Sequence, residues 1–326
     1  MKAEIIKLLK ERNGYVSGQE LCGRFGVSRT AVWKVIRQLE AEGYGIEAVR
    51  NRGYRLVEMT DVLSGAEIES CMEGGLIGAR VVYYEETDST NTRAKVLAEE
   101  GAPSGTLVVA EKQNAGKGRR GRGWSSPPGS GVWMSVVLRP DIEPSHASML
   151  TLTAALGVSE GIYRVTGIMP QIKWPNDLVL SGKKICGILT EMTTEMDTIQ
   201  YVVTGMGINV NTPEFPKELK DKASSLYLET GRTWRRGPLI GAMAFALGEY
   251  YERFLAAGDL GTLKGEYESR LANLNRQVTV LASGGEYRGT CLGIDRQGEL
   301  LVEREDGTVS RVLAGEVSVR GIYGYV

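Results

Sequence analysis

Hydrophobic residues recur at helical spacing three times near the start of the chain, and each run predicts a short helix. The first helix is expected over residues 3–11, the second after Ser17 and the third from Ser28 to about residue 42. Ser17 opens an S-x-x-E capping box, and Ser28 is a candidate N-cap. Segments 46–50 and 54–57 flank a turn and predict a hairpin. Three helices followed by a hairpin are typical of a winged helix-turn-helix.

From residue 63 to 275 strand and helix patterns alternate without a regular βαβ order. Strands are expected over residues 79–84, 106–111, 132–138, 171–174, 178–180, 184–192 and 200–208. Helices are expected over residues 91–100, 146–165 and 238–257. This irregular order favours a central mixed α/β domain of the α+β class, with a mixed or mostly antiparallel sheet.

Short apolar strands separated by turn signals follow from residue 276 to 326. They are expected over residues 278–281, 287–294, 300–302, 309–313 and 317–319. This pattern is typical of a small SH3-like β-barrel. The chain is therefore predicted to be an α+β multidomain protein, with domains at 1–62, 63–275 and 276–326.

Positive charge gathers on the third predicted helix and the hairpin. Residues 1–60 hold 11 Lys and Arg against 7 Asp and Glu, a net charge of +4. Such a surface suits a DNA backbone and groove edges. We therefore expect DNA contacts from Ser28, Arg29, Thr30, Lys34, Arg37, Arg50 and Arg52. A winged helix used for protein contacts is the alternative.

Composition narrows the class of protein. The 326 residues are 42% hydrophobic and 24% charged, as in ordinary globular proteins. The four cysteines form no CxxC pair, which disfavours a disulfide framework or structural zinc. No apolar run is long enough for a membrane span, and we expect a cytoplasmic location without a membrane partner. His146 is the single histidine, which excludes a site built on several histidines.

Residues 111–124, which we call the basic loop, read EKQNAGKGRRGRGW. They combine five Lys and Arg residues with four glycines, so positive charge meets a flexible backbone. This combination indicates an anion-binding loop, although basic glycine-rich runs are also solvated loops or nucleic-acid patches. The chain has no G-x-x-x-x-G-K-[ST] sequence, which excludes an ordinary P-loop.

Four segments of the central domain carry a family resemblance when taken together. They are Thr87 to Asn91, the basic loop, KWPND at 173–177 followed by Lys184, and GMGINVN at 205–211. Their order, spacing and identity resemble the biotin protein ligases. With the winged helix included, essentially the whole chain is similar to the bifunctional ligases that also repress biotin genes.

The resemblance implies an activity and its partners. Such a ligase joins biotin to ATP as biotinyl-5′-AMP, with Mg²⁺ offsetting phosphate charge, and transfers biotin to a lysine of a biotin carboxyl carrier protein. The adenylate is then expected to act as corepressor, with a homodimer formed on ligand binding and operator DNA as a further partner.

The resemblance also implies site residues. Catalytic roles fall on Arg119, Lys184 and Asp177. Biotin contacts fall on Ser89, Thr90, Asn91, Gln113, Gly116, Lys117, Gly118, Arg119, Arg120 and Lys184. Nucleotide contacts fall on Arg119, Arg122, Trp124, Asn176, Asn209 and Arg320. The sequence shows no dedicated metal cage, so it assigns no residues as metal ligands. Lys117 stands where the family often has Arg, which preserves charge and changes contact geometry.

Structural roles remain open for several of these residues. Asp177 lies in a turn-prone segment, Lys184 suits a strand surface, and Trp124 suits a core. Ser89 and Thr90 are also candidate helix caps.

Three rival functions share some of these features. One is a transcription factor whose central domain only senses a metabolite. Another is a lipoate or octanoate ligase, against which GRRGRGW and the DNA-binding unit argue. A third is nucleic-acid binding by the basic loop, which the lack of an aromatic stacking array disfavours.

Overall fold

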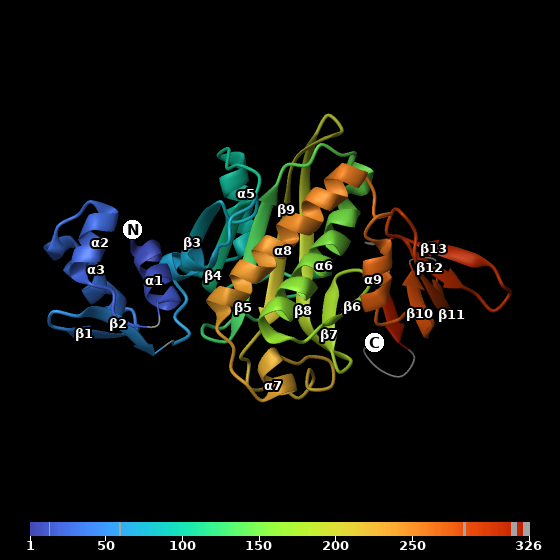
Figure 1. The fold of residues 1–326 in the computed structure, drawn as a ribbon. Coiled ribbons are helices and arrows are strands. Elements are labelled where there is room, and N and C mark those ends of the chain that lie inside the picture. The colour runs from blue at the N-terminus through green and yellow to red at the C-terminus, as the bar shows by residue number, and fades with distance from the viewer. Residues whose placement is uncertain (13, 59, 283–284, 314–317, 322–326) are drawn as a thin grey trace.

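The computed structural model describes residues 1–12, 14–58, 60–282, 285–313 and 318–321, with the backbone alone for residues 282 and 318–321. A small helical unit, a large central sheet with its helices, and a second small sheet lie side by side in chain order (Figure 1).

The winged helix is confirmed at the N-terminus. It consists of α1 (Lys2–Glu11), α2 (Gly18–Phe25), α3 (Arg29–Ala41) and the antiparallel pair β1 (Gly45–Val49) and β2 (Gly53–Glu58). Both expected caps form, since Ser17 Oγ accepts from the Glu20 amide at 3.0 Å and Ser28 Oγ from the Ala31 amide at 3.3 Å. Apolar residues of all three helices build a core of their own.

The central sheet is mixed and mostly antiparallel, as predicted. Its strands lie in the order β3-β4-β5-β9-β8-β7-β6, and β3 pairs with β4 in parallel. Their bounds are β3 (Arg80–Thr87), β4 (Thr106–Gln113), β5 (Gly131–Leu138), β6 (Gln171–Lys173), β7 (Asp177–Leu180), β8 (Lys183–Glu195) and β9 (Thr198–Asn209).

Helices cover both faces of this sheet. On one face lie α6 (Ala147–Thr166) and α8 (Arg236–Ala257), which share the main core with it, and on the other lies α5 (Thr90–Glu99). Three short helices were not predicted, namely α4 (Gly65–Cys71), α7 (Leu226–Thr230) and α9 (Lys264–Arg270). Each is too short to show a 3.6-residue period, although Ser64 and Ser225 cap two of them. The 3-10 turns are η1 (Arg119–Gly121) and η2 (Pro144–His146).

The C-terminal unit is a five-stranded antiparallel sheet of order β13-β12-β11-β10-β14. Its strands are β10 (Gln277–Ala282), β11 (Gly285–Ile294), β12 (Leu300–Glu303), β13 (Val309–Val312) and β14 (Ser318–Gly321). Residue 317 of the last predicted strand lies outside the described residues. The sheet shares its core with the central domain, and Trp174 Nε1 donates to the Gly298 carbonyl at 3.0 Å.

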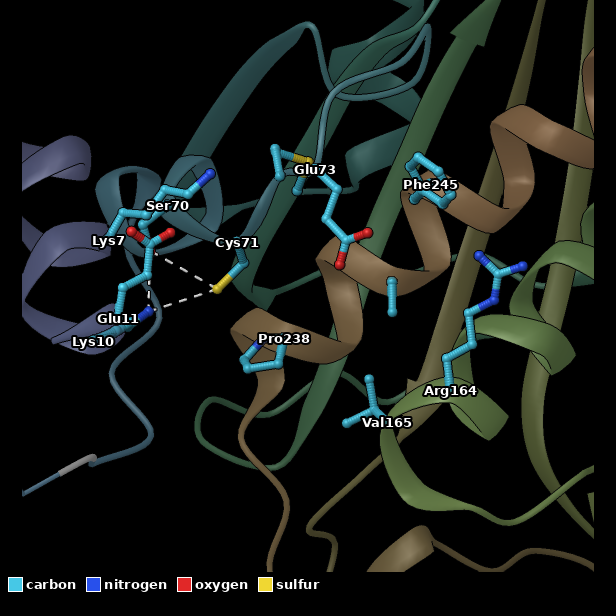
Figure 2. A pocket seen from close by; sticks show the side chains of 12 residues that line it. Lys7, Lys10, Glu11, Ser70, Cys71, Glu73, Arg164, Val165, Pro238 and Phe245 are labelled. Atoms are coloured by element: carbon cyan, nitrogen blue, oxygen red, sulfur yellow. Dashed lines mark hydrogen bonds between the residues drawn. The ribbon is translucent and has the colours of Figure 1, made fainter. Parts of the chain in front are cut away.

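A buried carboxylate joins the winged helix to the central domain. Glu67 of α4 is 3% exposed and accepts from Lys10 Nζ at 2.6 Å and from the Tyr44 hydroxyl at 2.8 Å. Lys10 also contacts Ser70 and Cys71 at the mouth of a cleft of about 450 Å³ between α1, α4, α6 and α8 (Figure 2). The two domains therefore meet through paired charges as well as apolar contact.

Candidate functional site

Alternation along β9 decides which face of the sheet carries the site. Val203 faces α5, whereas Met206 faces α6 and α8. On the α5 face the next two positions are Gly205 and Gly207. A Cβ at Gly205 would lie 2.0 Å from Asn91 Oδ1, and one at Gly207 would lie 2.5 Å from Trp124 Nε1. The start of α5 and the basic loop can therefore rest directly on the sheet.

The basic loop folds as a small hairpin. Lys117 pairs with Gly123, and the Gly118 amide donates to the Arg122 carbonyl at 2.7 Å. Arg120 has a left-handed backbone, with φ of 58°, within the turn η1. This fold leaves Arg120 and Arg122 exposed and turns Arg119 inward.

Two motifs that are distant in the sequence meet at the end of this hairpin. Arg119 Nη1 donates to Asn176 Oδ1 at 2.9 Å. Lys184 Nζ lies 2.5 Å from Asp177 Oδ1 and 5.2 Å from the centre of the Trp124 ring. The site thus gathers a guanidinium and an ammonium beside one carboxylate and one indole.

Burial perturbs the inner arginine of this group. Burial lowers the pKa of the Arg119 guanidinium below its usual value, the Asp177 carboxylate opposes that shift, and Arg120 adds to it. A guanidinium still remains charged at neutral pH. Arg119 is therefore a fixed and partly desolvated cation, which interacts with a nearby anion more strongly than an exposed one does.

Short polar side chains form a network at the start of α5. The backbone amide and the hydroxyl of Thr90 donate to Gln113 Oε1 at 2.7 and 3.1 Å. Ser135 Oγ donates to Asn91 Oδ1 at 2.6 Å, and Asn91 Nδ2 donates to Glu191 Oε2 at 2.7 Å. These hydrogen bonds fix the orientation of the side-chain amides of Gln113 and Asn91. The buried Ser89 holds the N-cap position of α5, and its side chain makes no capping bond.

The remaining predicted site residues lie in the basic loop, at the end of β9 and in β14. Lys117 is exposed and donates to Thr92 Oγ1 at 3.2 Å, while Gly116 and Gly118 are half-buried in the loop. Asn209 is buried and donates to the Ser224 carbonyl at 3.1 Å, which holds the chain after β9. Arg320 pairs with Thr279 through the backbone of β14, and its side chain lies outside the described residues.

A buried arginine that the sequence reasoning missed supports the site from behind. Arg236, the first residue of α8, donates through Nε to Asp61 Oδ2 at 2.7 Å and through Nη1 to Glu111 Oε2 at 2.9 Å. Glu111 begins the basic loop, and Asp61 lies in the connector from the winged helix. Asn211 Nδ2 also reaches Asp61, at 3.4 Å. In the sequence, this residue could have been found from the double arginine directly before a long apolar helix.

The predicted DNA contacts lie on one exposed surface of the winged helix. All seven residues are exposed on α3, at its N-cap or in the β1–β2 turn: Ser28, Arg29, Thr30, Lys34, Arg37, Arg50 and Arg52. The Arg52 guanidinium lies 5.0 Å from the centre of the Tyr15 ring, which supports the wing arginine. Arg37 pairs with Glu40 at 2.9 Å.

The described residues form neither a metal-binding cluster nor a membrane-spanning helix. Within those ranges no three His, Cys, Asp or Glu side chains come together as a metal site. The helices of the same ranges include none that is long and apolar enough to cross a membrane.

Family models match three parts of the chain. The biotin/lipoate A/B protein ligase family matches residues 83–209, an HTH domain matches 2–55, and the biotin protein ligase C terminal domain matches 274–320.

Characterised relatives match nearly the whole length. The chain is 40% identical to the bifunctional ligase/repressor BirA of Bacillus subtilis (strain 168), over 98% of both chains. It is 32% identical to that of Escherichia coli (strain K12), over 93% of this chain and 92% of the relative. The biotin protein ligase from Aquifex aeolicus in complex with biotin and ATP is similar with a TM-score of 0.65 and 33% identity, covering 74% of this chain and 99% of that one.

Proposed function

The chain belongs to the biotin/lipoate A/B protein ligase family, and we propose on that premise that it is an ATP-dependent biotin protein ligase and a transcriptional repressor of biotin genes. The observation that carries the enzymatic half is the meeting of Arg119 with Asn176 and of Lys184 with Asp177. The winged helix and the full-length similarity to ligase/repressors carry the regulatory half.

The first half-reaction must bring two anions together. A biotin carboxylate oxygen attacks the α-phosphorus of ATP, the bond to the β-phosphate oxygen breaks, and pyrophosphate leaves. Fixed positive charge in a partly buried site offsets the repulsion and stabilises the charge that develops in the transition state. Arg119 and Lys184 supply that charge, and the fork of Arg119 fits carboxylate or phosphate oxygens.

Biotin and nucleotide occupy the two sides of the basic loop in this proposal. The polar network of α5 suits the ureido ring, and we assign biotin contacts to Ser89, Thr90, Asn91, Gln113, Gly116, Lys117, Gly118, Arg119, Arg120 and Lys184. We assign nucleotide contacts to Arg119, Arg122, Trp124, Asn176, Asn209 and Arg320. For Trp124 this means the part of the indole that does not lie against Gly207.

The second half-reaction transfers the biotinyl group to a lysine of a biotin carboxyl carrier protein. The lysine nitrogen attacks the acyl carbon, AMP leaves, and the nitrogen loses a proton. An unperturbed lysine has a pKa of about 10.4, so little free amine exists at neutral pH. We assign orientation or deprotonation of that amine to Asp177. Its carboxylate already binds the Lys184 ammonium, so it must share or exchange that partner.

Mg²⁺, dimer formation and location complete the proposal. The described residues hold no acidic metal cluster, and Mg²⁺ is therefore proposed to bind together with the phosphates of ATP. No step above is assigned to the ion.

Biotinyl-5′-AMP is proposed to promote a homodimer that presents two winged helices to operator DNA. A cytoplasmic location suits ATP, the acceptor and the DNA.

Biotin-dependent exchange of labelled pyrophosphate into ATP tests the ligase directly. The wild-type chain should catalyse exchange, and Arg119→Ala should lower it about a hundredfold or more because one charge-stabilising donor is lost. Arg253→Ala, which removes an exposed arginine on α8, should leave it unchanged. A wild-type chain without biotin-dependent exchange would leave only a metabolite-sensing transcription factor. Faster exchange with octanoate or lipoate than with biotin would favour that rival ligase.

A further inference from the structure

Trp33 is the most exposed of the five tryptophans. Its exposed fraction is 52%, whereas Trp133 and Trp174 are buried and the other two are half-buried. Trp33 lies in the second turn of α3. A large indole left in water on a small domain is a candidate for burial against a partner.

The position of Trp33 on α3 fixes the direction in which it points. Thr30, Trp33, Lys34 and Arg37 follow the i, i+3, i+4, i+7 spacing of one helical stripe. The opposite side of α3 is buried in the winged-helix core and consists of Val32, Val35, Ile36 and Leu39. Trp33 therefore faces away from the domain, in the middle of the surface that carries the cations.

Charge identifies the partner. Lys34 and Arg37 flank the indole, and the wing adds two arginines beside Tyr15, at 5.0 Å for Arg52 and 5.1 Å for Arg55. Cations beside an exposed aromatic side chain on the same helix complement a polyanion whose interior is apolar. DNA has that form, because phosphates line the major groove and thymine methyl groups project into it.

We propose that Trp33 is a specificity-determining residue of the winged helix and reads a thymine-containing step in the major groove. This inference rests on the proposed repressor function. The indole face covers the C5-methyl group, its N–H donates to a neighbouring base acceptor, and the flanking cations hold phosphates. The division follows the general rule that phosphate contacts position a protein whereas base contacts specify the sequence.

The test uses the whole 326-residue chain with biotin and ATP, and a duplex that the wild-type chain selects from a randomised pool. Trp33→Ala should weaken binding to the selected duplex about tenfold or more, the usual loss for one base contact. Binding to an unrelated duplex and the salt dependence should not change. Trp33→Phe should keep part of the discrimination. Lys34→Ala should instead weaken binding to both duplexes and lower the salt dependence.

Replacing each thymine of the selected duplex by uracil removes only its methyl group. At one position per half-site the replacement should weaken wild-type binding and leave Trp33→Ala binding unchanged. Equal affinity of Trp33→Ala and wild type for the selected duplex, or equal losses on both duplexes, would overturn the inference. So would a changed oligomeric state with unchanged discrimination, which would place Trp33 between protein copies. If the wild-type protein selects no duplex, the repressor proposal fails instead. Pyrophosphate exchange should match the wild type in every variant.

Discussion

At the scale of single residues, two glycines of β9 set how closely the start of α5 and the basic loop, the proposed ligand-binding segments, approach the sheet. The hydrogen in place of a side chain at Gly205 admits the Asn91 amide, and the one at Gly207 admits the Trp124 indole. Both positions face α5, because side chains alternate along a strand. The GMG sequence is therefore a packing requirement of the site.

A methyl group at position 207 tests this requirement. Gly207→Ala places a carbon 2.5 Å from Trp124 Nε1, and overpacking of this kind costs about 1–3 kcal/mol. We expect the indole to shift and biotin-dependent exchange to fall about tenfold. Gly265→Ala in α9 is the matched control, since nothing lies within 4 Å of its added carbon. Unchanged exchange in Gly207→Ala would show that the depth of Trp124 does not matter.

Separate assays of the two half-reactions distinguish a role of Asp177 in acyl transfer from a purely structural role. Asp177→Asn keeps the shape of the side chain and removes its charge. Transfer from preformed biotinyl-5′-AMP to a carrier domain should slow about a hundredfold, the scale of a general-base contribution, and pyrophosphate exchange should change far less. Single-turnover assays measure the two rates. The reverse pattern would reassign Asp177 to holding Lys184 for adenylation.

At the scale of elements, the start of α8 ties the basic loop to the interdomain connector. Arg236 has little solvent contact and joins Asp61 to Glu111, and Glu111 also accepts from the Gly129 amide at 2.6 Å. The Glu111 carboxylate, held by this guanidinium, thus joins the two ends of the segment between β4 and β5. The hairpin that carries Arg119 depends on a helix more than a hundred residues later in the chain.

Removing this guanidinium should destabilise the chain strongly. Arg236→Met leaves two carboxylates facing each other without their shared partner, and breaking a buried pair costs about 3–5 kcal/mol. Urea unfolding measures the loss. Arg253→Met breaks an exposed pair with Glu266 and should cost about 1 kcal/mol or less. Equal losses in the two variants would contradict a supporting role for Arg236.

At the scale of the whole molecule, Glu67 links the winged helix to the central domain. Its carboxylate satisfies Lys10 and Tyr44, and burial together with that carboxylate raises the pKa of the Tyr44 hydroxyl. The winged helix otherwise has a separate core. Its attachment therefore depends on a small number of contacts around α4.

Loss of that carboxylate should uncouple the two units. Glu67→Ala removes the ionic partner of the Lys10 ammonium and the acceptor of the Tyr44 hydroxyl, at a cost of about 3–5 kcal/mol to the junction. Calorimetry should then show the winged helix unfolding in a separate transition at lower temperature. Glu20→Ala removes an exposed pair with Arg12 within the winged helix and should leave the transitions joined. A single unaltered transition in Glu67→Ala would mean that apolar contacts alone hold the junction.

Local patterns in the sequence predicted the long elements, the three-part organisation and the family. Hydrophobic periods of two and 3.6 residues are local properties, so they predicted α6, α8 and the sheet strands, and Ser17 and Ser28 marked helix starts. The short helices α4, α7 and α9 were not predicted, because five to seven residues show no clear hydrophobic period.

The contacts between residues distant in the sequence became visible in the fold alone. Arg119 and Asn176 are 57 residues apart, and Arg236 and Glu111 are 125 apart, so no local pattern indicates either pair. Those contacts follow from strand order and register, which place residues from distant segments on one face of the sheet. Trp33 was not singled out from the sequence; the folded domain shows that it lies opposite the apolar stripe of α3 and on the side left in solvent.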